Sequence, residues 1–141
     1  MKGRTYRYTT DVLFPFGFGL SYSQFNIGLG KLSKTTIKSN ENTQLSFPIE
    51  NSSKRDGTEI VQVYVRKLND PDGPLKTLKA FKRIDLKAGE KQNITIDLPA
   101  SSFEFYDAKI IGMNVTPGEY EVYYGNSSDA NDLKMTKITI Q

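Results

Sequence analysis

Polar and apolar residues alternate along most of the chain after residue 23. In residues 61–66, for example, a valine at every second position alternates with Gln62, Tyr64 and Arg66. Successive side chains of a strand point to opposite faces, so each such run predicts a strand with one buried face. The residues that these runs predict to lie in the core are Leu45, Phe47, Val61, Val63, Val65, Ile94, Ile96, Tyr120 and Val122.

Turn signals rich in glycine, proline and asparagine separate the alternating runs, for example at 51–57, 69–74 and 87–90. No segment keeps a 3.6-residue period over three turns, and residues 99–102 form at most one short helical turn. Seven or so short strands with regular turns are typical of a β-sandwich. The sequence therefore predicts an all-β domain with a β-sandwich fold over residues 23–141.

Three stretches depart from simple alternation. Pro48 lies inside a good strand pattern, which predicts that this strand is at a sheet edge or carries a bulge. Leu133 and Met135 have one parity and Ile138 the other, which predicts a bulge between them. Residues 75–86 have no clean period, although we expect them to form a strand.

The first 22 residues differ in composition from the rest of the chain. Phe14, Phe16, Phe18 and Tyr22 lie among glycines and a proline in a stretch that suits neither a strand nor a helix. Apolar surface of this size is unfavourable in water, so the segment must cover something. It either folds back over its own sandwich or docks on a neighbouring domain. Composition alone favours neither alternative.

Composition excludes several classes of function. The 141 residues suit one domain, and the net charge of +3 comes from 19 basic and 16 acidic residues without a basic run, so we expect no nucleic-acid partner. No apolar stretch reaches the roughly 18 residues of a membrane span, and no signal-peptide pattern is present, so we expect neither here. Without cysteine or histidine, thiolate sites and histidine-based catalysis are unavailable.

The remaining candidate chemistry is weak. Glu104 and Asp107 could form the carboxylate pair that glycoside cleavage needs, but carboxylates in turns are usually solvated or cap a backbone amide. Phe105, Tyr106, Tyr120, Tyr123 and Tyr124 could form a platform for sugar stacking, although the shared parity of Tyr120, Val122 and Tyr124 favours a core role and leaves only Tyr123 of the three tyrosines facing out. We therefore predict no catalytic, metal or cofactor site in this chain.

Several ordered motifs resemble the tail of family 3 glycoside hydrolases. They are GRTYRY at 3–8, LFPFGFGLSY at 13–22, RDGTEIVQVYV at 55–65, LKAFKRI at 78–84, KAGE at 87–90, FYD at 105–107 and PGEY at 117–120. Ala80 and Ala88 replace a glycine and a proline that are usual there. The resemblance implies a C-terminal domain with a fibronectin-III or immunoglobulin-like β-sandwich fold, which follows an N-terminal barrel and an α/β sandwich domain. It also implies that residues 1–22 are an interdomain linker and docking segment, with Phe14, Phe16, Phe18 and Tyr22 as the docking residues. The aspartate nucleophile and glutamate acid/base of these retaining enzymes belong to those other domains.

The resemblance implies an accessory domain that packs on and stabilises the catalytic domains of a β-glycosidase. The GRTYRY motif favours a β-xylosidase or arabinosidase, with β-glucosidase close behind. The chain alone is then no enzyme, its partners are the barrel and the α/β domain, and the aromatic segment could also self-associate. A periplasmic or secreted parent enzyme is the expectation. The rival hypothesis is a free-standing module that binds carbohydrate or protein.

Overall fold

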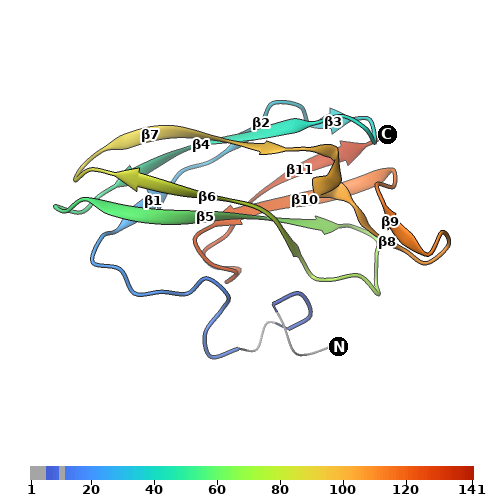
Figure 1. Ribbon diagram of the computed structural model, residues 1–141, viewed down its shortest axis with the longest axis horizontal. Helices are drawn as coiled ribbons and strands as arrows, with labels where there is room; N and C mark the ends of the chain where they lie inside the picture. Colours follow the sequence, from blue (N-terminus) through green and yellow to red (C-terminus); the bar gives the residue numbers. More distant parts are fainter. Residues whose placement is uncertain (1–5, 10–11) are drawn as a thin grey trace.

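A computed structural model describes residues 6–9 and 12–141 and shows two β-sheets packed face to face (Figure 1). The first sheet places β4 between β7 on one side and both β1 and β2 on the other, and the second has the order β3-β11-β10-β5-β6. The strands of the first sheet are β1 (Phe25–Ile27), β2 (Lys31–Leu32), β4 (Thr43–Asn51) and β7 (Lys91–Leu98). Those of the second are β3 (Thr36–Ile37), β5 (Gly57–Lys67), β6 (Thr77–Leu86), β10 (Gly118–Gly125) and β11 (Lys134–Ile140).

A short hairpin and a single helical turn complete the fold. The hairpin joins β8 (Phe105–Asp107) to β9 (Gly112–Asn114) and lies at one end of the sandwich (Figure 1). The 3-10 helix η1 (Ala100–Phe103) precedes it and matches the short turn expected after residue 98. The all-β sandwich predicted from the sequence is therefore confirmed, with additional short strands that the alternation did not resolve.

The space between the sheets holds the core. All nine residues that alternation predicted to be buried are buried, each with at most 5% of its surface exposed. Tyr120 also contacts Phe103 and Phe105, whose rings lie with centroids 5.8 and 5.9 Å away. The buried faces of the two sheets thus form one continuous apolar cluster.

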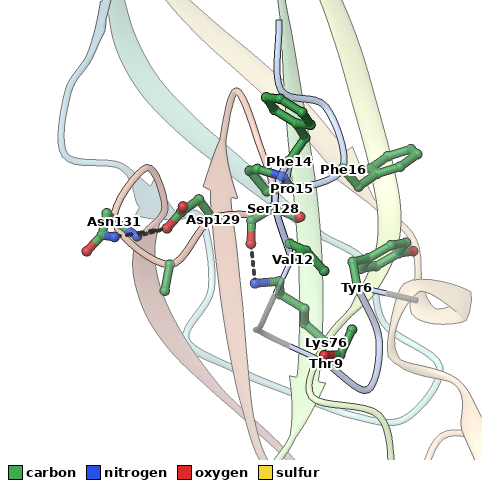
Figure 2. Close-up of a pocket in the computed structure, with 11 residues that line it drawn as sticks. Tyr6, Thr9, Val12, Phe14, Pro15, Phe16, Lys76, Ser128, Asp129 and Asn131 are labelled. Atoms are coloured by element: carbon green, nitrogen blue, oxygen red, sulfur yellow. Dashed lines mark hydrogen bonds between the residues drawn. The ribbon is translucent and has the colours of Figure 1, made fainter. Parts of the chain in front are cut away.

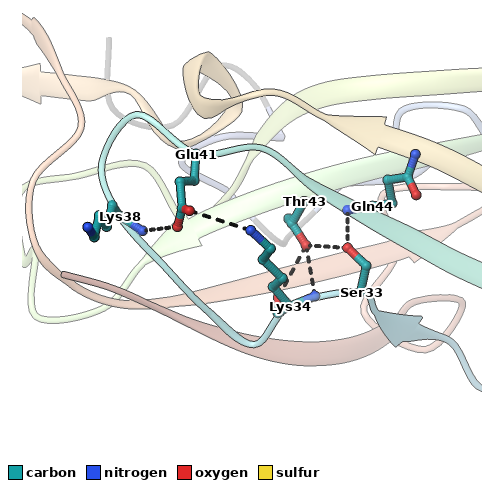
Figure 3. A network of polar contacts seen from close by, with 6 residues as sticks. All are labelled: Ser33, Lys34, Lys38, Glu41, Thr43 and Gln44. Carbon is teal, nitrogen blue, oxygen red and sulfur yellow. Dashed lines mark hydrogen bonds and ion pairs between the residues drawn. The ribbon is translucent and has the colours of Figure 1, made fainter.

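The chain passes from the first sheet to the second between β2 and β4. It leaves after β2, adds β3 in parallel to β11, and returns at Thr43. Thr43 Oγ1 lies 3.2 Å from Ser33 Oγ, accepts a hydrogen bond from the Lys34 amide at 3.3 Å and donates to the Lys34 carbonyl at 3.2 Å (Figure 3). Glu41 accepts hydrogen bonds from the Lys38 amide at 2.9 Å and from Lys34 Nζ at 3.4 Å. This network ties the start of the crossover to its end.

The position of β4 corrects the prediction for Pro48. The strand is not at an edge, because β7 pairs with it on one side and β1 and β2 on the other, and its pairing with β7 is regular through Pro48. The carbonyl of Pro48 points toward β1 and β2, where it accepts a hydrogen bond from Gly28 at 2.8 Å. Proline is tolerated there because the neighbouring edge is interrupted between β1 and β2, so no partner carbonyl needs its missing N–H. A side chain at Gly28 would place its Cβ 2.5 Å from Pro48 Cγ.

The bulge predicted near Met135 is also wrong. Strand β11 pairs with β10 in unbroken register, so Met135 faces outward while Ile138 and Ile140 enter the core. The strand expected over residues 75–86 is present as β6, and its pairing with β5 shifts at Val63/Tyr64. That shift leaves Lys79 as an extra residue, which explains why the apolar period of β6 is broken.

Candidate interdomain docking site

The described part of the N-terminal segment lies against the outer face of the five-stranded sheet, beneath β5 in Figure 1. Backbone hydrogen bonds hold it there at two points: the Leu75 amide donates to the Arg7 carbonyl at 2.6 Å, and the Ser128 amide donates to the Phe16 carbonyl at 2.7 Å. The Leu78 amide also donates to the Tyr6 hydroxyl at 3.2 Å. One of the two alternatives left open by the sequence, folding back over its own sandwich, therefore holds for this side of the segment.

The outer face of β5 is buried beneath this segment. Tyr64 has no exposed surface, its ring meets that of Tyr6 edge-on at 5.5 Å, and its hydroxyl donates a hydrogen bond to the Gln62 side chain. Burial raises the pKa of the Tyr64 hydroxyl well above its ordinary value. Gly17 has φ +84° and passes so close that a Cβ there would meet the Gln62 amide at 2.1 Å. A side chain at this position would thus disrupt the contact.

Sequence reasoning did not identify Tyr64 and Gln62 as part of the site. Alternation assigned both to a face directed at solvent, yet both are buried. A signal was present, because residues 60–65 read as a nearly continuous apolar run, which is typical of a strand covered on both faces. The cover is an irregular segment that no periodic pattern could place.

The segment leaves exposed the four aromatics that the sequence selected. Their exposed fractions are 71% for Phe14, 51% for Phe16, 51% for Phe18 and 94% for Tyr22. Phe14 and Phe18 pack on each other with ring centroids 5.2 Å apart, and Phe16 lies 5.2 Å from Tyr6. Leu13 and Leu20, each 95% exposed, extend the surface. We call these four aromatics the aromatic patch; soluble proteins rarely leave apolar side chains grouped in this way in water.

A cavity of about 790 Å³ opens beside the aromatic patch, between the segment and the loop that follows β10 (Figure 2). Phe14 and Phe16 line it on the segment side, and Ser128 and Asp129 line it on the loop side. Lys76 enters it from the sheet and donates a hydrogen bond from Nζ to the Ser128 carbonyl at 2.5 Å. Burial lowers the pKa of Lys76, against the attraction of Asp129. The cavity combines apolar walls with one cation, so it could receive an apolar side chain from a neighbouring domain.

Of the two carboxylates considered for catalysis, that of Asp107 caps a turn, because its Oδ1 accepts a hydrogen bond from the Lys109 amide at 2.8 Å. At Glu104 it is the backbone carbonyl that accepts a hydrogen bond, from Lys79 Nζ at 2.6 Å. Within the described residues there is no cluster of three or more acidic, histidine or cysteine side chains able to hold a metal ion. Nor does the described part of the chain contain a helix long and apolar enough to cross a bilayer.

The aromatics considered for sugar stacking do not form one platform. Phe105 is buried against Tyr120, whereas Tyr106 is exposed on the hairpin. Tyr123 lies on β10, where its hydroxyl donates to Glu121 Oε2 at 2.5 Å. Phe105, Tyr106 and Tyr123 therefore differ in burial, and Tyr123 lies on a different strand from the other two.

Residues 59–128 match the family described as Fibronectin type III-like domain. The two-sheet sandwich agrees with this match. Among curated proteins, the chain is 47% identical over 140 residues to Xylan 1,4-beta-xylosidase of Xylanibacter ruminicola, and 34% identical over 119 residues to Thermostable beta-glucosidase B of Acetivibrio thermocellus. These alignments cover 99% and 84% of this chain but only 16% of each relative.

Solved structures give the same result. The GH3 beta-glucosidase of Bifidobacterium adolescentis superposes with a TM-score of 0.77 at 36% identity, covering 89% of this chain and 18% of that one. The beta-glucosidase of Listeria innocua in complex with glucose superposes with a TM-score of 0.81 at 30% identity, covering 94% of this chain and 19% of that one. The chain belongs to the fibronectin type III-like domains of the family 3 glycoside hydrolases. It spans about a sixth of the length of the curated relatives named above.

Proposed function

We propose that this chain is a non-catalytic accessory domain that packs on the catalytic domains of a retaining β-glycosidase and stabilises them. Its partners are the N-terminal barrel and the α/β sandwich domain of the same enzyme. The observation that carries the proposal is the two-sided N-terminal segment. One side is bonded to the outer face of the sheet, and the other presents the aromatic patch to solvent.

The arrangement supports docking rather than a loose connection. The bonds from Leu75 and Ser128 fix the segment at both ends of its path across the sheet. An interface gains affinity when its contact residues are already held in place, because less conformational entropy is lost on binding. Large aromatics are also the residues that dominate interface energies. The patch and the adjoining cavity therefore form a surface prepared for a neighbouring domain.

The parent enzyme that we propose is a β-xylosidase. The support is the 47% identity to a protein named Xylan 1,4-beta-xylosidase, against 34% for the named beta-glucosidase, together with the GRTYRY motif at 3–8. The sugar is read by the catalytic domains in this proposal. Exchange of this domain between a β-xylosidase and a β-glucosidase is then expected to leave the preference of each enzyme for its aryl glycoside unchanged.

The test uses the full-length enzyme that contains this chain. Phe14→Ser removes a largely exposed aromatic, so it should lower the melting temperature of the enzyme while leaving the 141-residue chain as stable as before. The rate constants at a temperature where both enzymes are folded should stay the same. Loss of one buried large aromatic corresponds to roughly 1.5–3 kcal/mol.

Phe81→Ser is the matched control, because Phe81 is an equally exposed aromatic on β6, outside the segment. It should leave the melting temperature of the full enzyme unchanged. If Phe14→Ser and Phe81→Ser behave alike in the full enzyme, the aromatic patch is not the docking surface and the proposal fails.

A further inference from the structure

A second cavity, of about 690 Å³, lies where residues 7 and 8 meet the start of β6 and the β8–β9 hairpin. Arg7, Thr77 and Lys79 all border it. The backbone hydrogen bond from the Leu75 amide to the Arg7 carbonyl places Arg7 beside the start of β6, the strand that contains Thr77 and Lys79. The cavity is separate from the one beside the aromatic patch, and the proposed docking function does not use it.

Two polar atoms in this cavity are buried without a partner. Arg7 Nε and Thr77 Oγ1 have almost no exposed surface and no hydrogen-bond partner among the described residues. More than nine in ten buried polar groups in proteins are hydrogen-bonded, so two such atoms beside one cavity require an explanation. Burial without a partner is unfavourable for each of them.

Arg7 and Lys79 bring positive charge and hydrogen-bond donors to this cavity. Within the described part of the chain, Arg7 takes part in no ion pair; its guanidinium lies 5.8 Å from the centre of the Tyr8 ring. Lys79 Nζ lies 4.9 Å from the centre of the Phe105 ring and donates one hydrogen bond, to the Glu104 carbonyl. Burial lowers the pKa of Lys79, and the Arg7 guanidinium lowers it further, against the attraction of Glu104. Arg7 and Lys79 therefore border the same cavity, and both have N–H donors beyond those used in the contacts named above.

We propose that Arg7, Thr77 and Lys79 form a binding site for a single carboxylate group. A guanidinium N–H, a hydroxyl and an ammonium all donate, and an ionised carboxylate only accepts, with room for several such bonds. Two further lysines, Lys67 and Lys109, also border the cavity, as do four carboxylates, those of Asp70, Asp72, Glu104 and Asp107. Positive and negative groups are thus equal in number around it, which opposes a doubly charged phosphate more than a singly charged carboxylate. Tyr8 and Tyr106 border it as well and offer apolar surface to the body of the ligand.

The carboxylate has two sources with the same chemistry: an acidic sugar, or an aspartate or glutamate side chain of a neighbouring domain. The 141-residue chain is titrated with sodium glucuronate, with sodium acetate, with glucose and with inorganic phosphate, while the Arg7 Nε–H resonance is followed by NMR. Both carboxylates should shift this resonance in a saturable way, and glucose should not. Phosphate should bind more weakly than acetate.

Variants separate binding from folding. Arg7→Gln lacks the resonance that is followed, so binding to each variant is measured by isothermal titration calorimetry. Arg7→Gln should weaken carboxylate binding roughly tenfold or more, because hydrogen bonds to charged groups are the strong ones. Thr77→Val should weaken it less and keep the shape of the side chain. Arg83→Gln, at an exposed arginine of β6, should bind like the unmodified chain. Circular dichroism melting of each variant shows whether it is folded.

Tighter binding of glucuronate than of acetate identifies an acidic sugar as the ligand, and equal binding identifies a protein carboxylate. The proposal is overturned if neither carboxylate shifts the Arg7 resonance, if glucose shifts it equally, or if folded Arg7→Gln and Thr77→Val bind as tightly as the unmodified chain. Phosphate binding tighter than either carboxylate would overturn the choice of ligand.

Discussion

Tyr124 in β10 reaches across the sandwich to Gly30, whose backbone amide donates a hydrogen bond to the tyrosine hydroxyl at 2.5 Å. The same hydroxyl donates to the Gly28 carbonyl at 3.3 Å, and the ring stacks on Phe47 with centroids 5.2 Å apart. Gly28 and Gly30 lie between β1 and β2, where the edge of the first sheet is interrupted. The hydroxyl of Tyr124, in the second sheet, thus takes the place of a strand partner for Gly28 and Gly30 at the interrupted edge of the first sheet.

Tyr124→Phe should lower the free energy of unfolding by about 1–3 kcal/mol, because it leaves the part-buried Gly30 amide without its acceptor. The ring and its stacking on Phe47 are kept, so the loss isolates the hydroxyl. Urea denaturation of the chain measures it. Tyr106→Phe is the control, since Tyr106 is exposed on the hairpin, and its stability should not change. Equal stability of both variants would show that water replaces the tyrosine at Gly30.

Val63→Ala should cost about 1–3 kcal/mol of unfolding free energy through lost burial and a residual cavity. Val63 is fully buried in the middle of β5. Ile60→Ala on the same strand removes more atoms from an exposed position and should change stability by no more than about 0.5 kcal/mol. A neutral effect of Val63→Ala would mean that the core has relaxed to fill the space.

The core could be predicted because strand geometry converts a two-residue period directly into two faces. This logic held for β4, β5, β7 and β10, where alternate residues enter a single core. It failed for Pro48, because the sequence does not show that a neighbouring strand is interrupted at the same level. It failed for Met135, because the residue type alone does not show whether a methionine is buried or, as here, exposed on the outer face.

The candidate site was predicted only on its exposed side. The density of aromatics in residues 14–22 identified Phe14, Phe16, Phe18 and Tyr22, since apolar side chains in an irregular segment need a partner. Tyr6 and Tyr64, which hold the segment from beneath, were missed. Their contact joins residues 58 positions apart through a segment without period, so only the folded chain brings it into view. The carboxylate site depends on Arg7 for the same reason.

The isolated chain should associate in a concentration-dependent way through the aromatic patch. Phe14 and Phe18 already pack together and leave much of their surface in water, so pairing with a second copy would bury it. Sedimentation velocity over a range of concentrations should show association for the unmodified chain and a monomer for Phe14→Ser/Phe18→Ser. Phe81→Ser should associate like the unmodified chain. If all three remain monomeric, the patch does not bind itself.

Glu59→Gln should make the chain more stable at neutral pH. Burial raises the pKa of Glu59, opposed by hydrogen bonds from the Ile60 amide at 2.9 Å and the Asn126 side chain at 3.5 Å. The folded chain therefore binds this proton more tightly than the unfolded chain, so the stabilisation is fully present below the unfolded pKa near about 4.3 and is lost as pH rises through the raised folded pKa. The gain from Glu59→Gln should be present at pH 7 and disappear below about pH 4. Thermal melts across this range measure it.

Glu41 provides a control of opposite sign. The Lys38 amide holds the pKa of Glu41 below its ordinary value, with the Lys34 ammonium acting in the same direction. Its contribution is therefore present above the unfolded pKa and lost as pH falls, so Glu41→Gln should lower stability at pH 7 and not at low pH. If both variants shift the melting temperature in the same direction at pH 7, the burial of Glu59 and the hydrogen bond to Glu41 do not explain their effects.

The burial of Tyr64 beneath Tyr6 and Gly17 decides how this domain can be recombined. A chimaera that joins a foreign enzyme to this sandwich at its first strand would remove the segment that covers β5. Tyr64 and Gln62 would then face water. The unit that can be transferred between enzymes therefore begins before the first strand and includes the N-terminal segment that covers β5. Engineers who swap such modules between glycosidases would need to move the crossover point to before Tyr6.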